Sequence, residues 1–244
     1  MNHHAAPTIV VENASLKFEN KTVFQDLNLT LQGGKLTCLL GASGVGKTSL
    51  LRLIAGLSEP DFKGNTAQAG NLISYMAQTD LLLPWLTVLD NVLLGSTLRG
   101  STSPREKAHE LLANVGLGSA LNLFPRELSG GMRQRAALAR TLIEDTNVVI
   151  MDEPFSALDA ITRYNLQTLA AELLRDRTVF LVTHDPLEAL RIADEIYIMS
   201  GSPASLHSPF TLKTKTPREI SSEELLELQP ILFTELLKAS ETTV

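Results

Sequence analysis

The sequence predicts an α/β fold with a mostly parallel β-sheet. Several apolar runs have the length and composition of buried strands, and amphipathic segments at helical spacing separate them. The runs are 147–151, 178–182 and 195–199, and the amphipathic segments are 161–174 and 187–193. Strands that alternate with helices favour a parallel sheet that is covered on both faces. A glycine-rich loop between an apolar strand and a helix supports the same class of fold.

The N-terminal 40 residues predict a small antiparallel β subdomain built from short strands. Its expected strands are 8–13, 14–20, 21–24, 26–32 and 35–40. In the fourth of these, Leu27, Leu29 and Leu31 alternate with polar neighbours, which is typical of a half-buried strand. The period changes after residue 49, where Leu50, Leu53, Ile54 and Leu57 are spaced as on one face of a helix.

The segment from about 80 to 145 predicts an inserted α-helical subdomain. Thr87 and Ser103 are each followed three residues later by an acidic residue, as in a capping box. Pro104 suits the first helical position, and Gly116 suits the end of a helix.

The chain as a whole predicts one large domain over 1–215 and a helical tail over 216–244. Ser221 and Glu224 have the spacing to cap a last helix, which Pro230 should break or kink.

Composition excludes several classes of protein. The formal net charge of −6 gives no broad field for nucleic acid, so we expect no nucleic-acid partner. Cys38 is the one cysteine, which rules out an internal disulfide and fits a reducing compartment. The longest apolar stretch, 81–89, contains Pro84 and is well short of the roughly 20 residues of a membrane span. No secretory signal is visible at the N-terminus.

The loop "GASGVGKTS" at 41–49 matches the pattern G-x-x-x-x-G-K-[ST] between a strand and a helix. Glycines let backbone N–H groups approach phosphate oxygens, and the helix start adds a positive dipole. Lys47 would reach the β- and γ-phosphates, and Thr48 would bind Mg²⁺. The pattern predicts a P-loop NTPase with a RecA-like core that binds ATP. The predicted nucleotide contacts here are Gly41, Ala42, Ser43, Gly44, Val45, Gly46, Lys47, Thr48 and Ser49.

An acid pair follows the apolar run "VVIM" at 148–151. Asp152 and Glu153 should therefore lie at the carboxyl edge of the sheet, where ligands bind in such folds. We expect Asp152 to hold Mg²⁺ and Glu153 to polarise the attacking water. An ordinary capped strand end is the alternative. Asp159, a little further on, is a candidate nucleotide contact.

Two single polar residues follow other predicted strands. His184 comes directly after "FLVT" and would contact the γ-phosphate, although a lone histidine after a strand is often structural. Gln78 follows "LISYM" and would reach Mg²⁺ or the water.

Together with "LSGGMRQR" at 128–135, these motifs resemble the ATP-binding-cassette ATPases. The order and approximate spacing agree from about residue 8 to 200. "LSGGMRQR" distinguishes this family from other P-loop proteins, and a P-loop kinase would have no use for it.

The resemblance implies a head-to-tail homodimer in which each chain lends a helix entrance to the partner's ATP. Ser129, Gly130 and Gly131 would then contact the γ-phosphate bound by the other chain. By itself, such a segment is also an ordinary helix N-cap with a flexible turn. The family places an aromatic residue under adenine, and Phe18 is the matching position, with a core aromatic as the alternative.

Closer resemblance points to ATPase subunits of bacterial importers for nitrate, sulfonate, taurine and thiamine-precursor pyrimidines. The run 151–204 looks most like the hydroxymethylpyrimidine branch. Such a subunit would lie on the cytoplasmic face of the inner membrane and bind integral permease subunits. It would act indirectly with a periplasmic or lipid-anchored substrate-binding protein. The rival class is a soluble, non-transport cassette protein, although the tandem cassettes, coiled coils or basic arms typical of such proteins are not visible.

The apolar segment 79–91 includes the one tryptophan, Trp85. We expect part of it to form the groove that receives a short helix of the permease. Ordinary helical core is the alternative.

Overall fold

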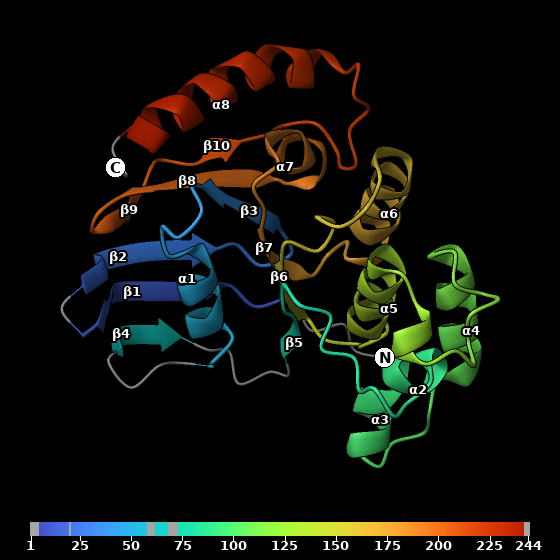
Figure 1. Ribbon diagram of the computed structural model, residues 1–244. Helices are drawn as coiled ribbons and strands as arrows, with labels where there is room; N and C mark the ends of the chain where they lie inside the picture. Colours follow the sequence, from blue (N-terminus) through green and yellow to red (C-terminus); the bar gives the residue numbers. More distant parts are fainter. Residues whose placement is uncertain (1–4, 20, 58–61, 68–72, 242–244) are drawn as a thin grey trace.

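One β-sheet runs through the residues that the computed structural model describes, which are 5–19, 21–57, 62–67 and 73–241 (Figure 1). Its strands are β1 (Ile9–Phe18), β2 (Lys21–Leu31), β3 (Leu36–Gly41), β4 (Phe62–Ala67), β5 (Ile73–Met76), β6 (Val148–Asp152), β7 (Thr178–Val182), β8 (Glu195–Gly201), β9 (Ala204–Leu206) and β10 (Phe210–Thr211). The helices are α1 (Lys47–Ile54), α2 (Val88–Val92), α3 (Leu94–Leu98), α4 (Arg105–Asn114), α5 (Gly130–Leu142), α6 (Ala160–Leu173), α7 (Pro186–Ile192) and α8 (Glu223–Glu241).

The central part of the sheet is parallel, as predicted. Strands β8, β3, β7, β6 and β5 are neighbours in that order, and each adjacent pair among them is parallel. The carboxyl ends of these strands therefore lie at one edge of the sheet.

The N-terminal antiparallel part is also present, but its strands are longer than predicted. β1 pairs antiparallel with both β2 and β4. The four short strands expected between 8 and 32 are two long ones, because irregularities in the pairing interrupt the side-chain alternation without ending the strand. Asn13 and Asp26, with φ of 51° and 49°, lie within these strands. The short strand β9 joins this part to the parallel part.

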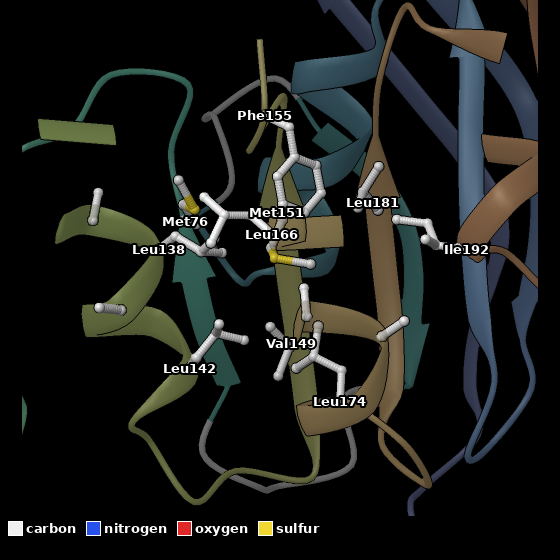
Figure 2. Close-up of a cluster of buried hydrophobic side chains, with 14 of the residues drawn as sticks. Met76, Leu138, Leu142, Val149, Met151, Phe155, Leu166, Leu174, Leu181 and Ile192 are labelled. Atoms are coloured by element: carbon white, nitrogen blue, oxygen red, sulfur yellow. The ribbon is translucent and has the colours of Figure 1, made fainter. Parts of the chain in front are cut away.

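The two faces of the parallel sheet bury different side chains. Val148, Ile150 and Phe180 pack with α1 on one face. Alternate residues of the same strands, such as Val149, Met151 and Leu181, pack with α5, α6 and α7 on the other (Figure 2). This alternation is the strand period of two. The helix α1 ends at Ile54, and Leu57 is 48% exposed, so the predicted fourth contact of this helix is wrong.

The segment predicted as a helical insertion contains α2, α3, α4 and α5. Thr87 caps α2 as predicted, since its hydroxyl accepts the N–H of Asp90. The predicted cap at Ser103 is wrong, because α4 has Pro104 at its N-cap position and no side-chain cap. Gly116, with φ of 71°, follows the end of α4 as expected.

The C-terminal helix α8 is continuous through Pro230 rather than broken there, and it lies along α7 and β8 (Figure 1). Arg218, just before α8, is 3% exposed and donates to the carbonyl oxygens of Leu190 and Ala193, at 3.0 and 2.7 Å. It also pairs with Glu224 at 3.1 Å. The predicted cap at Ser221 is misplaced by one residue, because α8 begins at Glu223 and Ser222 directly precedes it.

Burial alone would raise the pKa of Glu224, but hydrogen bonds from Thr214 and Lys213 and the charge of Arg218 outweigh it and lower the pKa to about 2. The carboxylate of Glu224 is thus ionised throughout the physiological pH range.

The division of the chain into a large domain and a helical tail at about residue 215 stays a prediction.

The Arg218→Ala variant should unfold more easily, because it leaves Glu224 without its cation and removes the Arg218 donor from the carbonyl oxygens of Leu190 and Ala193. We expect the free energy of unfolding to fall by about 3 kcal/mol, and the melting temperature to fall by about 6–12 °C. The control is Lys238→Ala, which removes an exposed ion pair with Glu235 and should cost about 0.5 kcal/mol or less. Equal melting temperatures of the two variants would show that the contacts of Arg218 with Glu224, Leu190 and Ala193 do not stabilise the fold.

Candidate nucleotide-binding and hydrolysis site

The predicted site residues follow four neighbouring parallel strands. The glycine loop comes after β3, the acid pair ends β6, Gln78 lies two residues beyond β5, and His184 lies two residues beyond β7. Since β3, β7, β6 and β5 are adjacent and parallel, these segments share the edge at which α/β folds bind ligands.

The loop between β3 and α1 needs glycine at specific positions. Gly41 has a φ of 153°, and a Cβ there would lie 2.4 Å from the carbonyl oxygen of Met199. Gly46 has a φ of 117°, and its Cβ would lie 2.7 Å from the Cγ1 of Val23. Val45 is buried and anchors the loop in the core. The glycines thus allow a tight loop whose N–H groups lead into the start of α1, where the first N–H groups have no partner within the helix.

Lys47 is a buried cation at the start of α1. Its Nζ donates to the carbonyl oxygens of Gly41 and Ala42, at 2.7 and 2.9 Å. Burial lowers the pKa of Lys47, and the nearby Glu153 and Asp152 partly offset that effect. A desolvated ammonium beside unpaired helix N–H groups is suited to bind phosphate oxygens.

Thr48 and Asp152 are joined across the site. The hydroxyl of Thr48 donates to Oδ2 of Asp152 at 2.8 Å. Burial raises the pKa of Asp152, which is 2% exposed, and the hydrogen bond from Thr48 counteracts this rise. A hydroxyl and a carboxylate beside a phosphate loop are the oxygen ligands that Mg²⁺ takes, so these residues fit the ion. When bound, Mg²⁺ would neutralise charge on the phosphates.

Glu153, Gln78 and His184 form one cluster. Nε2 of Gln78 donates to Oε2 of Glu153 at 3.3 Å, and Nδ1 of His184 lies 3.3 Å from Oε1 of Glu153. The side chain of Glu153 is 18% exposed, and that of His184 is 60% exposed. The structure therefore brings together the three residues predicted to act in hydrolysis, around a partly buried carboxylate that solvent can reach.

The main chain holds Glu153 in an unusual conformation. Its φ is 49°, in the left-handed region that costs energy for a side chain with a Cβ. Its N–H donates to the carbonyl oxygen of Val182 at 2.8 Å, and its own carbonyl oxygen accepts from Nε2 of Gln134 at 2.9 Å and from Oγ of Ser156 at 3.1 Å. The carboxylate is thus aimed by a backbone that neighbouring elements fix.

Phe18, at the end of β1, lies beside the phosphate loop. It is 39% exposed and lines a cavity of about 420 Å³ together with residues 43–46 and Ser49. This exposure disagrees with the alternative of a core aromatic, and the contact of Phe18 with adenine stays a prediction.

Residues 129–131 and Asp159 lie at the starts of two other helices, apart from the phosphate loop of the same chain. Ser129 is the N-cap of α5, where its hydroxyl accepts the N–H of Met132. Figure 1 draws α5 and α1 apart, with β6 between them. Asp159 is exposed and caps α6 by accepting the N–H of Thr162, and its hydrogen bonds to Thr162 lower its pKa. Within one chain, both segments serve as helix caps.

Several residues that support the site were not predicted. Two arginines of α5 hold the segment after Gln78, because Arg133 pairs with Asp80 at 3.1 Å and Arg140 donates to the carbonyl oxygens of Asp80 and Leu81. Gln134, between them in sequence, reaches the backbone of Glu153. The available signal for Arg133 and Gln134 was the run "MRQR" at 132–135, whose long polar side chains follow directly on a helix start.

A phosphate loop facing an acid pair at the strand ends defines the protein as a P-loop ATPase. Comparison with known proteins narrows the class. A family profile described as "ABC transporter" matches residues 24–156. An ABC transporter ATP-binding protein of Haemophilus influenzae is 42% identical over 93% of this chain and 97% of its own length. Aliphatic sulfonates import ATP-binding protein SsuB 1 of Rhodococcus jostii is also 42% identical, over 91% of each chain.

A solved structure has the same fold. It is the dimeric, post-hydrolysis state of the ATP-binding cassette MJ0796 bound to ADP and Pi, with a TM-score of 0.76 and 27% identity over 84% of this chain and 99% of that one. The chain belongs to the ABC transporter family, as an ATP-binding subunit that hydrolyses ATP. In the described part of the chain, every helix is too short or too polar to cross a membrane.

Proposed function

We propose that this chain is the ATPase subunit of an importer, in which two copies bind MgATP head to tail and drive solute uptake through separate membrane subunits. The observation that carries the proposal is the cluster of Gln78, Glu153 and His184 beside the phosphate loop. The importer role is supported by the relative from Rhodococcus jostii, which is named an import ATP-binding protein.

The proposed division of labour follows the geometry. The loop N–H groups and Lys47 hold the phosphates, while Thr48 and Asp152 hold Mg²⁺. Glu153 accepts a proton from the attacking water, because it is the carboxylate with solvent access that lies next to Asp152. Gln78 and His184 orient Glu153 and contact the water and the γ-phosphate, respectively.

The proposed dimer gives residues 129–131 a second role. Ser129 and Gly130 are exposed at the start of a helix, where backbone N–H groups and the helix dipole favour an anion. Gly131 is half-buried beside them. In a head-to-tail pair this helix start would face the ATP of the other chain, and Asp159 would lie near the same interface. The cassette MJ0796, whose solved structure is dimeric and bound to ADP and Pi, supports a dimer.

The surface near Trp85 is the proposed contact with the permease. Trp85 is 69% exposed and Leu81 is 60% exposed, whereas three other apolar residues of the segment are buried in the core, namely Leu82, Val88 and Leu89. Arg140 holds the carbonyl of Leu81 and also lines a groove of about 270 Å³ between α3 and β5. Leu98, 78% exposed, lines the same groove. A short helix with apolar side chains would cover these residues, and the groove lies close to the segment that carries Gln78.

The Trp85→Asp variant should keep its ATPase activity within about twofold but lose co-purification with its permease by about tenfold or more, because a carboxylate would be buried at the contact. Phe233→Asp is the matched control, since Phe233 is a 55% exposed aromatic on α8, away from this surface. If a folded Trp85→Asp protein binds the permease as well as the Phe233→Asp control does, the contact lies elsewhere on the chain.

The cargo is chosen by the permease and the binding protein rather than by this chain. Aliphatic sulfonates are favoured by the named relative, and hydroxymethylpyrimidine stays the cargo predicted from residues 151–204. Uptake by the reconstituted complex distinguishes the two cargoes. Each compound is tested with membranes in which this chain lies at the cytoplasmic face. Failure of uptake with both, together with no permease in a pull-down, would favour a non-transport role.

A further inference from the structure

The side chain of Gln134 bridges α5 and the turn that follows Glu153. Its Nε2 donates to the carbonyl oxygen of Glu153 at 2.9 Å and to Oγ of Ser156 at 3.3 Å. Its Oε1 accepts the N–H of Ala157 at 2.7 Å. Both ends of the amide are therefore used, and the side chain is 7% exposed.

The start of α5 also lies next to the same turn. A Cβ on Gly131 would lie 3.4 Å from the carbonyl oxygen of Ala157 and 3.7 Å from the side chain of Leu158. The three hydrogen bonds of the buried Gln134 amide therefore join the helix start and the turn into one unit.

The two ends of this unit lead to different nucleotides. One end is the exposed helix start at 129–131, which contacts the partner's ATP in the proposed dimer. The other end is Glu153, which acts on the ATP of its own chain. We infer that Gln134 is a positioning residue that ties the main chain at Glu153 to α5, so that the helix serving the partner's ATP also sets the carboxylate of its own chain. This inference rests on the proposed head-to-tail dimer.

Loss of the amide should affect turnover rather than binding. Glu153 has a φ of 49°, and the Gln134 donor is one of the few contacts that hold its carbonyl in that conformation. The Gln134→Met variant keeps the length of the side chain and removes both hydrogen-bonding atoms. We expect kcat to fall by about tenfold or more while the affinity for ATP changes by less than about twofold, since the phosphate loop is untouched and a small displacement of a catalytic group is costly.

A pair of mixed dimers tests whether Gln134 acts on its own chain. In the first, a Gln134→Met chain is limiting and a Glu153→Gln chain is in excess, so the active Glu153 lies in the chain that lacks Gln134. In the second, an unmodified chain is limiting and the excess chain carries both substitutions. ATP hydrolysis is compared with that of unmodified chain mixed with excess Glu153→Gln chain.

The inference predicts that the first dimer loses about tenfold or more in activity and that the second keeps the reference activity. The opposite pattern would mean that Gln134 only shapes the helix start for the partner's ATP. Equal losses in both dimers, or no loss in either, would also overturn the inference.

Two controls keep the result clear. Gln167→Met removes another buried glutamine that bridges two elements, to Glu188 and Arg191, and should leave kcat within about twofold. If Gln134→Met does not fold, Gln134→Glu replaces it, because it keeps the acceptor for Ala157 but sets a carboxylate against the carbonyl of Glu153.

ATP-driven dimerisation of the Glu153→Gln chain is measured before the mixed dimers. Its absence contradicts the dimer and the inference together, whereas its presence with unaffected mixed dimers contradicts the inference alone.

Discussion

Replacement of Glu153 by glutamine is expected to slow ATP hydrolysis by about 100-fold or more while ATP still binds. Glutamine keeps the size of the side chain but has one acceptor oxygen in place of the two that face Gln78 and His184, and it has no carboxylate to accept a proton from water. The residues that hold the phosphates, Lys47 and Thr48, are unchanged.

Phosphate release and equilibrium nucleotide binding are the two measurements for this variant. Glu235→Gln is the control, because Glu235 is an acid on α8 that pairs with Lys238, three residues further along the same helix. Hydrolysis within about threefold of the unmodified protein would remove Glu153 from the role of base.

The Lys47→Ala variant is expected to bind ATP about 100-fold more weakly, since it removes a buried cation from the phosphates. The substitution also frees the loop carbonyls of Gly41 and Ala42 from their donor, so the loop itself should become less ordered. Titration with a fluorescent ATP analogue measures the loss. Lys35→Ala is the matched control, because Lys35 is a half-exposed lysine in a long 3.9 Å pair with Asp194. Equal affinity of the two variants would show that Lys47 does not hold the phosphates.

The parts of the site that could be predicted are those in which chemistry follows from consecutive residues. The phosphate loop is such a part, because nine neighbouring residues between a strand and a helix carry the whole cradle. The acid pair, Gln78 and His184 could be placed because each follows a strand, and parallel strands end at one edge.

The parts that could not be predicted depend on contacts distant in sequence. Gln134 and Glu153 meet only because α5 packs on the sheet beside β6, which no local pattern specifies. The strands β9 and β10 are too short to give an alternating pattern. The helix α1 ends earlier than its apolar spacing predicts. The spacing continues to Leu57, but Gly56, with φ of 73°, follows the C-cap and ends the helix.

In the proposed dimer, residues 129–131 of each chain contact the ATP that is bound by the phosphate loop of the other chain. A mixed dimer tests this contact most directly. One chain carries Lys47→Ala, and the other carries Ser129→Arg, which puts a bulky cation into the partner's γ-phosphate site. Both also carry Glu153→Gln, so that bound ATP is retained rather than hydrolysed. The measurement is stable ATP occlusion in each chain alone and in an equal mixture.

If residues 129–131 act on the partner's ATP, each chain alone should fail and the mixture should recover up to about a quarter of the normal signal, because random pairing makes about half of the dimers mixed and each of these keeps one of its two sites. No recovery, with both chains shown to be folded and paired, would contradict the claim.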